Sequence, residues 1–326
     1  PFTHSAWEQR MAYAASLPSP VVFANLVGGS DALIFDGRSF VLDGENGVVL
    51  PGFEEAVRVI DLNDLPKFSP PTDDISTVKN ALVLGLRDFA QKNSIQHAFL
   101  GLSGGIDSSV VAALAAEALS PVDVTGIAMP SRHTDPRSTQ AAEKLAANLG
   151  IGFALTPIEP LHTAAQAAQP ELFGEGVGAE NVQARLRMVI LMGYVNNFGG
   201  MLLNTGNKTE AAVGYATLYG DTAGTLCPIA DLTKPEVYEL ARHINAEKEV
   251  IPQFALERAP SAELHPGQVD PFDYDEISPK LEELVLHNQS NPAMRAAEHK
   301  RAQSGVVLKV SEKAFGSGRM IPITRK

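Results

Sequence analysis

The sequence has one cysteine and no long apolar run. With only Cys227 available, neither an intrachain disulfide nor a zinc site built from several cysteines can form. This usage fits a reducing compartment, and we expect a cytoplasmic location. No stretch of about 18 apolar residues occurs, so we expect no membrane-spanning helix. The sequence also shows no leader of basic and then apolar residues, so we expect no secretory signal.

Basic residues are also scarce. The 326 residues include 26 Lys and Arg against 38 Asp and Glu, which gives a formal net charge of −12. A chain this acidic is a poor general binder of nucleic acids and anionic membranes, so we expect neither as a partner. A local positive pocket for an anionic small molecule remains compatible with this charge. Because 44% of the residues are hydrophobic and 20% are charged, a disordered or fibrous protein is excluded.

A polar stretch that contains three prolines, residues 61–74, divides the chain and suits an extended linker. Before it, a helix-like stretch precedes short apolar runs separated by glycines and Asp-Gly turns, a pattern typical of a small β-meander. We therefore expect two domains, residues 1–65 and residues 66–326. Because about 65 residues make a poor independent core, the first part is expected to pack on the second or to belong to a larger domain.

After the linker, apolar strand-like runs alternate with helical patterns. The expected strands are residues 97–102, 122–129, 153–158 and 201–204, and the expected helices are residues 75–92, 107–119, 136–149, 180–197 and 235–245. This alternation predicts an α/β fold with a parallel sheet that is covered by helices on both faces. Ligands of such sheets bind at the carboxyl ends of the strands.

The segment 101–109, GLSGGIDSS, lies at the first such strand end and opens an Ala-rich helix. Its glycines permit close approach of backbone N–H groups to a phosphate, and the helix N-terminus adds a favourable partial charge. Ser103, Ser108 and Ser109 add hydroxyl donors. A carboxylate beside a phosphate is repulsive unless a cation lies between them, so we interpret Asp107 as a Mg²⁺ ligand. The alternative is an ordinary turn in which Asp107 caps the helix.

The string SGGIDSS resembles the pyrophosphatase-type loop of ATP-dependent adenylating enzymes, which cleave ATP to AMP and pyrophosphate. The rest of the chain, from residue 75 onward, is similar to NAD synthetases in the family's order. The similar segments are ENVQARLRM (180–188), NTGNKTE (204–210), PIADLTK (228–234), APSAEL (259–264) and EHKR (298–301).

Residues 25–29 and 35–40 resemble the last part of the nitrilase-type glutaminase domain that precedes the synthetase in glutamine-dependent NAD synthetases. In that branch a Glu-Lys-Cys triad generates ammonia, and all three positions would lie upstream of the segment matched here. Cys227 lies in the synthetase part. The resemblance thus implies ammonia as the nitrogen donor for this chain, and glutamine in an intact parent protein.

The resemblance implies a sheet of the adenine nucleotide alpha-hydrolase type, preceded by a small β-rich nitrilase-like fragment. It also implies an ATP-dependent carbon–nitrogen ligase that converts deamido-NAD to NAD. The nicotinate carboxylate would attack ATP to give an acyl-adenylate and pyrophosphate, and ammonia would then give NAD and AMP. The implied cofactors are ATP and Mg²⁺, and the implied assembly is a homodimer or a higher homo-oligomer.

The resemblance also assigns roles to residues. Asp107, Glu210 and Lys234 would be catalytic, with the two carboxylates holding Mg²⁺ and the lysine neutralising the ATP phosphates. The implied ATP contacts are Gly101, Leu102, Ser103, Gly104, Gly105, Ile106, Asp107, Ser108, Ser109, Arg132, Thr205, Lys234 and Ser261. The implied deamido-NAD contacts are Asn181, Arg185, Glu210, Asp221, His299 and Lys300, with Asn181 and Arg185 on one helix face and acting across a dimer interface.

Each role has an ordinary structural alternative. Glu210 fits a first-turn acid that stabilises a helix dipole, and Lys234 fits a solvated lysine before a helix. Residues 299–301 fit a solvated helix end. Arg187, on the helix of Asn181, fits a polar helix face as well as a ligand contact.

Two positions depart from the ammonia-only branch of the family. Leu218 stands where that branch has a lysine, and Thr225 where it has an aspartate, so those substrate contacts are not carried over. For the whole chain, the alternatives are another adenylating enzyme such as GMP synthetase, or a nucleotide-binding module without catalysis.

Overall fold

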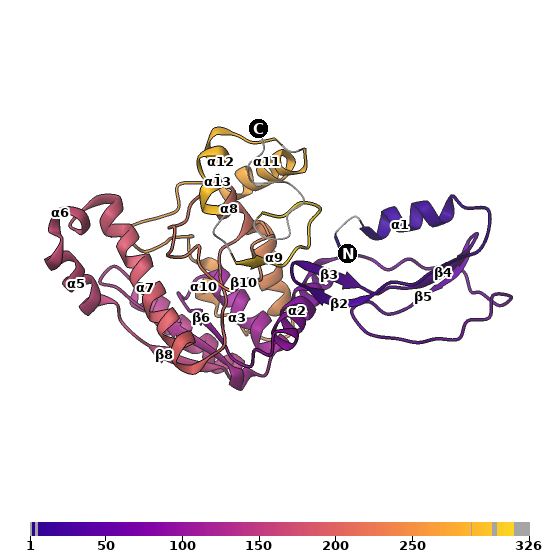
Figure 1. The fold of residues 1–326 in the computed structure, drawn as a ribbon, viewed down its shortest axis with the longest axis horizontal. Coiled ribbons are helices and arrows are strands. Elements are labelled where there is room, and N and C mark those ends of the chain that lie inside the picture. The colour runs from indigo at the N-terminus through magenta and orange to yellow at the C-terminus, as the bar shows by residue number, and fades with distance from the viewer. Residues whose placement is uncertain (1, 4–5, 288, 302–304, 316–326) are drawn as a thin grey trace.

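The computed structural model describes residues 2–3, 6–287, 289–301 and 305–315 (Figure 1). A four-stranded parallel sheet with the order β8-β7-β6-β9 forms its centre. The strands are β6 (Ala98–Gly101), β7 (Val124–Ala128), β8 (Gly152–Leu155) and β9 (Met201–Leu202). Three of them lie within the ranges expected from the sequence and β8 begins one residue earlier than expected, so the predicted parallel sheet is confirmed.

Helices cover both faces of this sheet, as predicted. Successive side chains of β6 point to opposite faces: Leu100 packs in one core cluster, while Phe99 packs in another with Leu191. The first face is covered by α2 (Ile75–Lys92), α3 (Ile106–Ala118), α4 (Pro136–Leu149) and α9 (Lys234–Ile244), and the second by α7 (Gly176–Phe198).

Several helix ends follow directly from local sequence. Helix α2 begins after Asp74, whose carboxylate accepts hydrogen bonds from the backbone N–H groups of Ser76 (2.9 Å) and Thr77 (3.2 Å). Helix α4 begins after Asp135 with Pro136 in its first turn and ends at Gly150, which has φ +70°. These ends agree with the sequence-based expectation.

The N-terminal part forms two small sheets rather than the single meander expected from the sequence. The Asp-Gly pair at Asp43 does turn a hairpin, with Gly44 at φ +59°. The pair at Asp36 does not, because Gly37 and Arg38 both have positive φ and carry the chain from one sheet into the other. The elements are α1 (Ala6–Ala15), β1 (Val21–Phe23), β2 (Val27–Ser30), β3 (Leu33–Asp36), β4 (Phe40–Asp43) and β5 (Asn46–Val49), in the sheets β1-β4-β5 and β2-β3.

The β2-β3 hairpin packs directly on α2. The backbone N–H of Gly29 donates to Asp88 Oδ2 at 2.8 Å, and Lys92 donates to the Gly29 carbonyl. Ile34 of β3 is buried in the main core cluster. The three-stranded sheet and α1 have a small core of their own and extend away from the central sheet (Figure 1). Residues 61–74 contain no helix or strand beyond an isolated bridge at Lys67, as expected for an extended linker.

The remaining elements surround the carboxyl ends of the sheet or extend from it. The short parallel pair β10-β11 brings a late segment of the chain beside the loop that follows β9. No helix among the described residues is long and apolar enough to cross a membrane. The other bounds are η1 (Pro121–Asp123), α5 (Glu159–Ala168), α6 (Pro170–Phe173), α8 (Lys208–Val213), β10 (Leu226–Cys227), α10 (Gln253–Glu257), α11 (Tyr274–Leu286), α12 (Pro292–Ala296), α13 (Glu298–Arg301) and β11 (Val306–Val307).

Candidate functional site

The loop between β6 and α3 has the backbone geometry of a phosphate cradle. Gly104 has φ +77°, and a Cβ atom there would lie 2.1 Å from the backbone oxygen of Ser138, so the position requires glycine. Gly105 is the N-cap of α3 and supplies no side-chain cap. The first-turn residues Ile106, Asp107 and Ser108 line a cavity of about 350 Å³. Backbone N–H groups at the start of a helix lack intrahelical partners, so they are suited to bind an anion.

The serine hydroxyls shape this loop. Ser108 and Ser109 are buried, and their hydroxyls donate to the Gly105 carbonyl at 3.1 and 2.8 Å. The hydroxyls of Ser103 and Ser108 lie 3.1 Å apart. Of residues 101–109, all but Gly104 and Ser109 line the cavity. The loop is therefore held in shape before any ligand binds.

Two carboxylates and one lysine converge beside this loop. Lys234, at the start of α9, lies with its Nζ 2.5 Å from Asp107 Oδ2 and 3.7 Å from Glu210 Oε1. Asn207 connects the two acids, because its amide donates to Asp107 Oδ1 at 3.0 Å and its side-chain oxygen accepts from the Glu210 N–H. The Lys234 Nζ also lies 5.3 Å from the ring centroid of Tyr274. The three residues predicted to be catalytic thus come together from α3, α8 and α9.

The two carboxylates and the lysine shift one another's protonation. Burial raises the pKa of Glu210 to about 8, and the nearby Asp107 carboxylate adds to the effect. Burial disfavours the charged form of Lys234, but the two carboxylates outweigh it and hold the lysine pKa above its ordinary value. At neutral pH the metal-free cluster therefore holds a proton on Glu210, and it gains a second negative charge only when that proton is lost.

This pair of carboxylates can hold a divalent cation. Mg²⁺ is commonly bound through one or two protein carboxylates, with water and substrate phosphates completing its coordination. Within the described ranges, no group of three or more His, Cys, Asp or Glu residues is arranged to hold a metal ion. Asp107 and Glu210 are hard oxygen donors beside a phosphate cradle, so the donor set suits Mg²⁺.

The cavity brings together only some of the residues expected to bind substrates. Thr205, Asp221, Ser261 and Lys300 join the loop and the catalytic cluster in its lining. Arg132 does not, because its guanidinium forms an ion pair with Glu159 on α5. The side chains that lie outside the cavity lining are Arg132, Asn181, Arg185 and His299.

Helix α7 presents a different arginine to the cavity from the one expected. Arg187 lines the cavity with its Nε donating to the Met129 carbonyl at 3.0 Å. Burial lowers the pKa of Arg187 to about 10, which leaves it charged at neutral pH. Arg185 is exposed and donates to the Leu218 carbonyl, and Asn181 accepts from the hydroxyl of Thr217 at 2.7 Å. Asn181 and Arg185 are therefore not contacts within this chain's own cavity.

The basic cluster near the C-terminal end is mostly occupied by backbone contacts. Lys300 donates to the carbonyls of Gly214 and Ala216 at 2.8 and 2.6 Å. Arg301 is buried and donates to the carbonyls of Ala211 and Ala212, near the end of α8. Both residues line the cavity and hold the segment that follows Glu210. Asp221, opposite them, has its pKa raised to about 6 by burial.

Sequence reasoning assigned no role to three other residues at the site. Asn207 and Glu210 form a reciprocal helix cap, and their spacing of three is a signal that reveals such a cap. Tyr274 lies over Lys234, and its hydroxyl donates to Asp270 at 2.8 Å. No local pattern marks Tyr274 or Asp270, because both depend on how α11 packs.

Comparisons with known proteins agree with this geometry. The family model described as NAD synthase matches residues 78–315. The chain is 41% identical to the glutamine-dependent NAD(+) synthetase of Synechocystis sp., over 94% of this chain and 61% of that protein. It therefore spans about three-fifths of that curated relative.

Solved structures extend the comparison to the fold. Glutamine-dependent NAD+ synthetase from Acinetobacter baumannii, in complex with ADP, is 31% identical with a TM-score of 0.75, over 99% of this chain and 66% of that one. NMN synthetase from Francisella tularensis is 30% identical with a TM-score of 0.59, over 70% of this chain and 92% of that one. The family model matches most of the chain, and the phosphate loop, the acidic pair and the lysine lie in one cavity. This chain therefore belongs to the NAD synthase family.

Proposed function

We propose that this chain catalyses the ATP-dependent amidation of deamido-NAD with ammonia, giving NAD, AMP and pyrophosphate. The convergence of Asp107, Glu210 and Lys234 beside the phosphate loop supports the proposal most directly. A carboxylate is a poor acyl donor because its leaving group would be oxide. Transfer of AMP to the carboxylate supplies a good leaving group, so the first task of the site is to promote that transfer.

In the first step, the nicotinate carboxylate attacks the α-phosphorus of ATP and pyrophosphate departs. The free N–H groups at the start of α3 are placed to accept the departing pyrophosphate, and Lys234 adds a positive charge beside them. Asp107 and Glu210 would hold Mg²⁺, which neutralises phosphate charge when bound. In the second step, ammonia attacks the acyl carbon, AMP leaves and the nitrogen loses a proton.

The cavity offers positive groups for the second substrate as well. The guanidinium of Arg187 lines the same cavity as Asp107, Glu210 and Lys234, and we assign it to an anionic group of deamido-NAD. Ser261 and Thr205 in the lining would contact ATP. Asn181 and Arg185 would contact deamido-NAD only from a second copy of the chain, because they lie outside this chain's own cavity.

Ammonia is the proposed donor for the 326-residue chain. Release of ammonia from glutamine by a cysteine requires a reactive thiolate. Cys227 is the single cysteine, it is buried, and burial raises its pKa to about 12. This thiol is therefore not available as the nucleophile.

A second candidate substrate is nicotinate mononucleotide. It is favoured by the likeness to NMN synthetase from Francisella tularensis, of which this chain covers 92%. Both candidates have the same reacting carboxylate and differ in the adenylate half of the molecule. The cavity residues that contact the carboxylate do not discriminate between them.

The test is an amidation assay with ATP and Mg²⁺. Deamido-NAD, nicotinate mononucleotide and xanthosine monophosphate are offered in turn, each with ammonium or with glutamine. We expect NAD and AMP in equal amounts from deamido-NAD and ammonium, and no product from glutamine. A higher kcat/KM for xanthosine monophosphate than for either nicotinate would overturn the proposal, and robust glutamine-driven synthesis would overturn the donor assignment.

A further inference from the structure

One wall of the cavity is a loop whose anchor has no assigned role. Residues 258–264 follow α10, line the cavity and carry Ser261. Within this loop Glu263 has φ +50°, a left-handed conformation that glutamate rarely adopts. Such a conformation persists where the surrounding contacts over-determine it, and it often marks a functional constraint.

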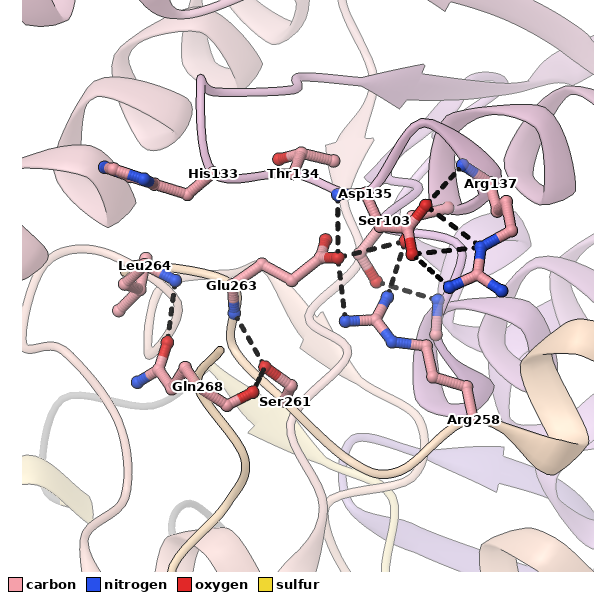
Figure 2. Close-up of polar contacts among 12 residues, drawn as sticks. Ser103, His133, Thr134, Asp135, Arg137, Arg258, Ser261, Glu263, Leu264 and Gln268 are labelled. Carbon is pink, nitrogen blue, oxygen red and sulfur yellow. Dashed lines mark hydrogen bonds and ion pairs between the residues drawn. The ribbon is translucent and has the colours of Figure 1, made fainter. Parts of the chain in front are cut away.

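The carboxylate of Glu263 is held by two donors from the start of α4 and by one from within the wall loop (Figure 2). Its Oε1 accepts from the backbone N–H of Asp135 at 3.0 Å and from the hydroxyl of Ser138 at 3.1 Å. The guanidinium of Arg258 lies 2.9 Å from the same oxygen. Asp135 is the N-cap of α4 and Ser138 lies in its first turn. The wall loop is thus attached to the N-terminus of α4, where a negative charge is favourable.

Ser138 connects this attachment to the phosphate loop. Its hydroxyl also accepts from Arg258 Nη1 at 2.7 Å. Its backbone oxygen lies so close to Gly104 that a Cβ atom on that glycine would be only 2.1 Å from the oxygen. Ser138 is fully buried, so it has no room to move independently. The side chain of one residue therefore holds the wall loop while its backbone contacts the phosphate loop.

The rest of the wall loop is held by contacts within the loop and by α7. The Glu263 N–H donates to Ser261 Oγ at 3.1 Å, and that hydroxyl donates to the Gln268 carbonyl at 2.6 Å. Gln183 of α7 donates to the Leu264 carbonyl at 2.8 Å. Loss of the Glu263 carboxylate would leave these contacts in place, and on the α4 side only the hydrogen bond from Arg258 to Ser138 would still hold the loop.

We propose that Glu263 is a positioning residue that fixes the distance between the wall loop and the phosphate loop, and so completes the binding site for ATP. The proposal rests on the proposed function for the identity of the nucleotide. The attachment joins the loop to α4 on the side of Gly104, so its loss acts first on ATP. The Glu263 carboxylate also raises the pKa of Arg187 electrostatically, so a smaller effect on the second substrate is expected.

Equilibrium binding of a non-hydrolysable ATP analogue with Mg²⁺ tests this directly. Glu263→Gln removes the charge and keeps the size of the side chain. Glu263→Asn is too short to reach α4, but asparagine adopts the left-handed conformation readily. Glu257→Gln is the matched control, because Glu257 is exposed on the adjacent α10 and accepts a hydrogen bond from Gln253 Nε2 at 2.9 Å.

We expect both Glu263 variants to bind the analogue about tenfold more weakly, as for a loop that is closed about a tenth of the time. The KM for ATP rises in proportion and by more than the KM for deamido-NAD, while kcat stays within about twofold and Glu257→Gln matches the wild type. Normal binding by Glu263→Asn would show that the backbone conformation, and not the carboxylate, positions the loop, and would overturn the proposal.

The binding measurement separates this proposal from the proposed function. If the wild-type chain binds the analogue but makes no NAD, the proposed function fails while a tenfold loss in the Glu263 variants still supports the positioning role. If the wild type makes NAD and the Glu263 variants bind the analogue normally, the positioning role fails alone. A fall in kcat without a change in analogue affinity would also overturn it.

Discussion

Glu210 is the residue whose proton should govern metal binding. Its pKa is raised from 4.5 to about 8, first by burial and then by Asp107. A proton and Mg²⁺ compete for the same carboxylate, so the metal must displace the proton near neutral pH. In the metal-free protein, the raised pKa means that the stability contributed by this group is present below pH 4.5 and is lost as pH rises through 8.

We therefore expect Mg²⁺ affinity to rise with pH by up to about tenfold per unit below the pKa of Glu210, and to level off above it. Isothermal titration with Mg²⁺ in two buffers of different ionisation enthalpy measures the affinity and the proton released. Glu210→Gln should abolish the proton release. Asp107→Asn removes a neighbouring charge and should move the pH dependence downward. An affinity that does not change between about pH 7 and pH 9 would contradict this role, since that interval, roughly one unit on each side of the pKa, spans most of the titration.

At the scale of elements, the turn between β6 and α3 depends on the close packing of Gly104 against α4. An alanine at this position would place its Cβ 2.1 Å from the Ser138 oxygen, in a backbone with φ +77°. Both the strain and the clash must displace the phosphate loop. We expect Gly104→Ala to weaken binding of the ATP analogue by about 100-fold, comparable to the loss of one oxyanion-stabilising donor.

Gly44 supplies a matched control for that substitution. It has φ +59° in the β4-β5 hairpin, and a Cβ there meets no atom within 4 Å. Gly44→Ala should lower the free energy of unfolding by about 1 kcal/mol through backbone strain alone and leave nucleotide affinity unchanged. Equal effects of the two alanines on analogue binding would show that the contact of Gly104 with Ser138 is unimportant.

Local sequence predicted those elements whose ends are set by short-range chemistry. The caps at Asp74, Asp135 and Gly150 follow from side-chain and backbone rules that act within a few residues. The pairing of strands in the N-terminal part was predicted wrongly, because Gly37 and Arg38 redirect the chain and no local rule distinguishes this Asp-Gly pair from a hairpin turn.

In the candidate site, too, local sequence predicted some residues and tertiary packing determined the others. Asp107 was identified by the chemistry of its loop, whereas Glu210 and Lys234 were named through the family resemblance. Helical spacing places Asn181 and Arg185 on one face, but it does not say what that face meets. Arg187, two residues further, is the arginine that enters the cavity. The anchoring role of Glu263 depends on contacts with residues 125 and 128 positions away, which no local pattern encodes.

At the scale of the whole molecule, α7 has an exposed apolar stripe on the side away from the cavity. Val189 and Met192 are 65% and 38% exposed, and both lie within one or two turns of Arg185. Exposed apolar side chains also occur on the neighbouring α5 and α6, at Leu161 and Leu172. Exposed apolar side chains gathered on neighbouring helices are typical of an interface. A second copy of the chain seated here would bring Asn181 and Arg185 toward a partner's site.

We accordingly expect the chain to be a dimer in solution and to dissociate when charge is placed on this stripe. Size-exclusion chromatography with light scattering should give about twice the monomer mass for the wild type and the monomer mass for Val189→Glu combined with Met192→Glu, because a dimer has two copies of the same buried patch. Val57→Glu combined with Val59→Glu is the matched control, since both valines are almost fully exposed in the N-terminal part. Dissociation should abolish amidation. The α7 double variant can then be mixed with a Lys234→Met chain, which is inactive but keeps α7 intact. Recovery of amidation in this mixture would show that α7 residues complete the partner's site. A monomeric wild type with full activity would exclude this arrangement and return Asn181 and Arg185 to a structural role.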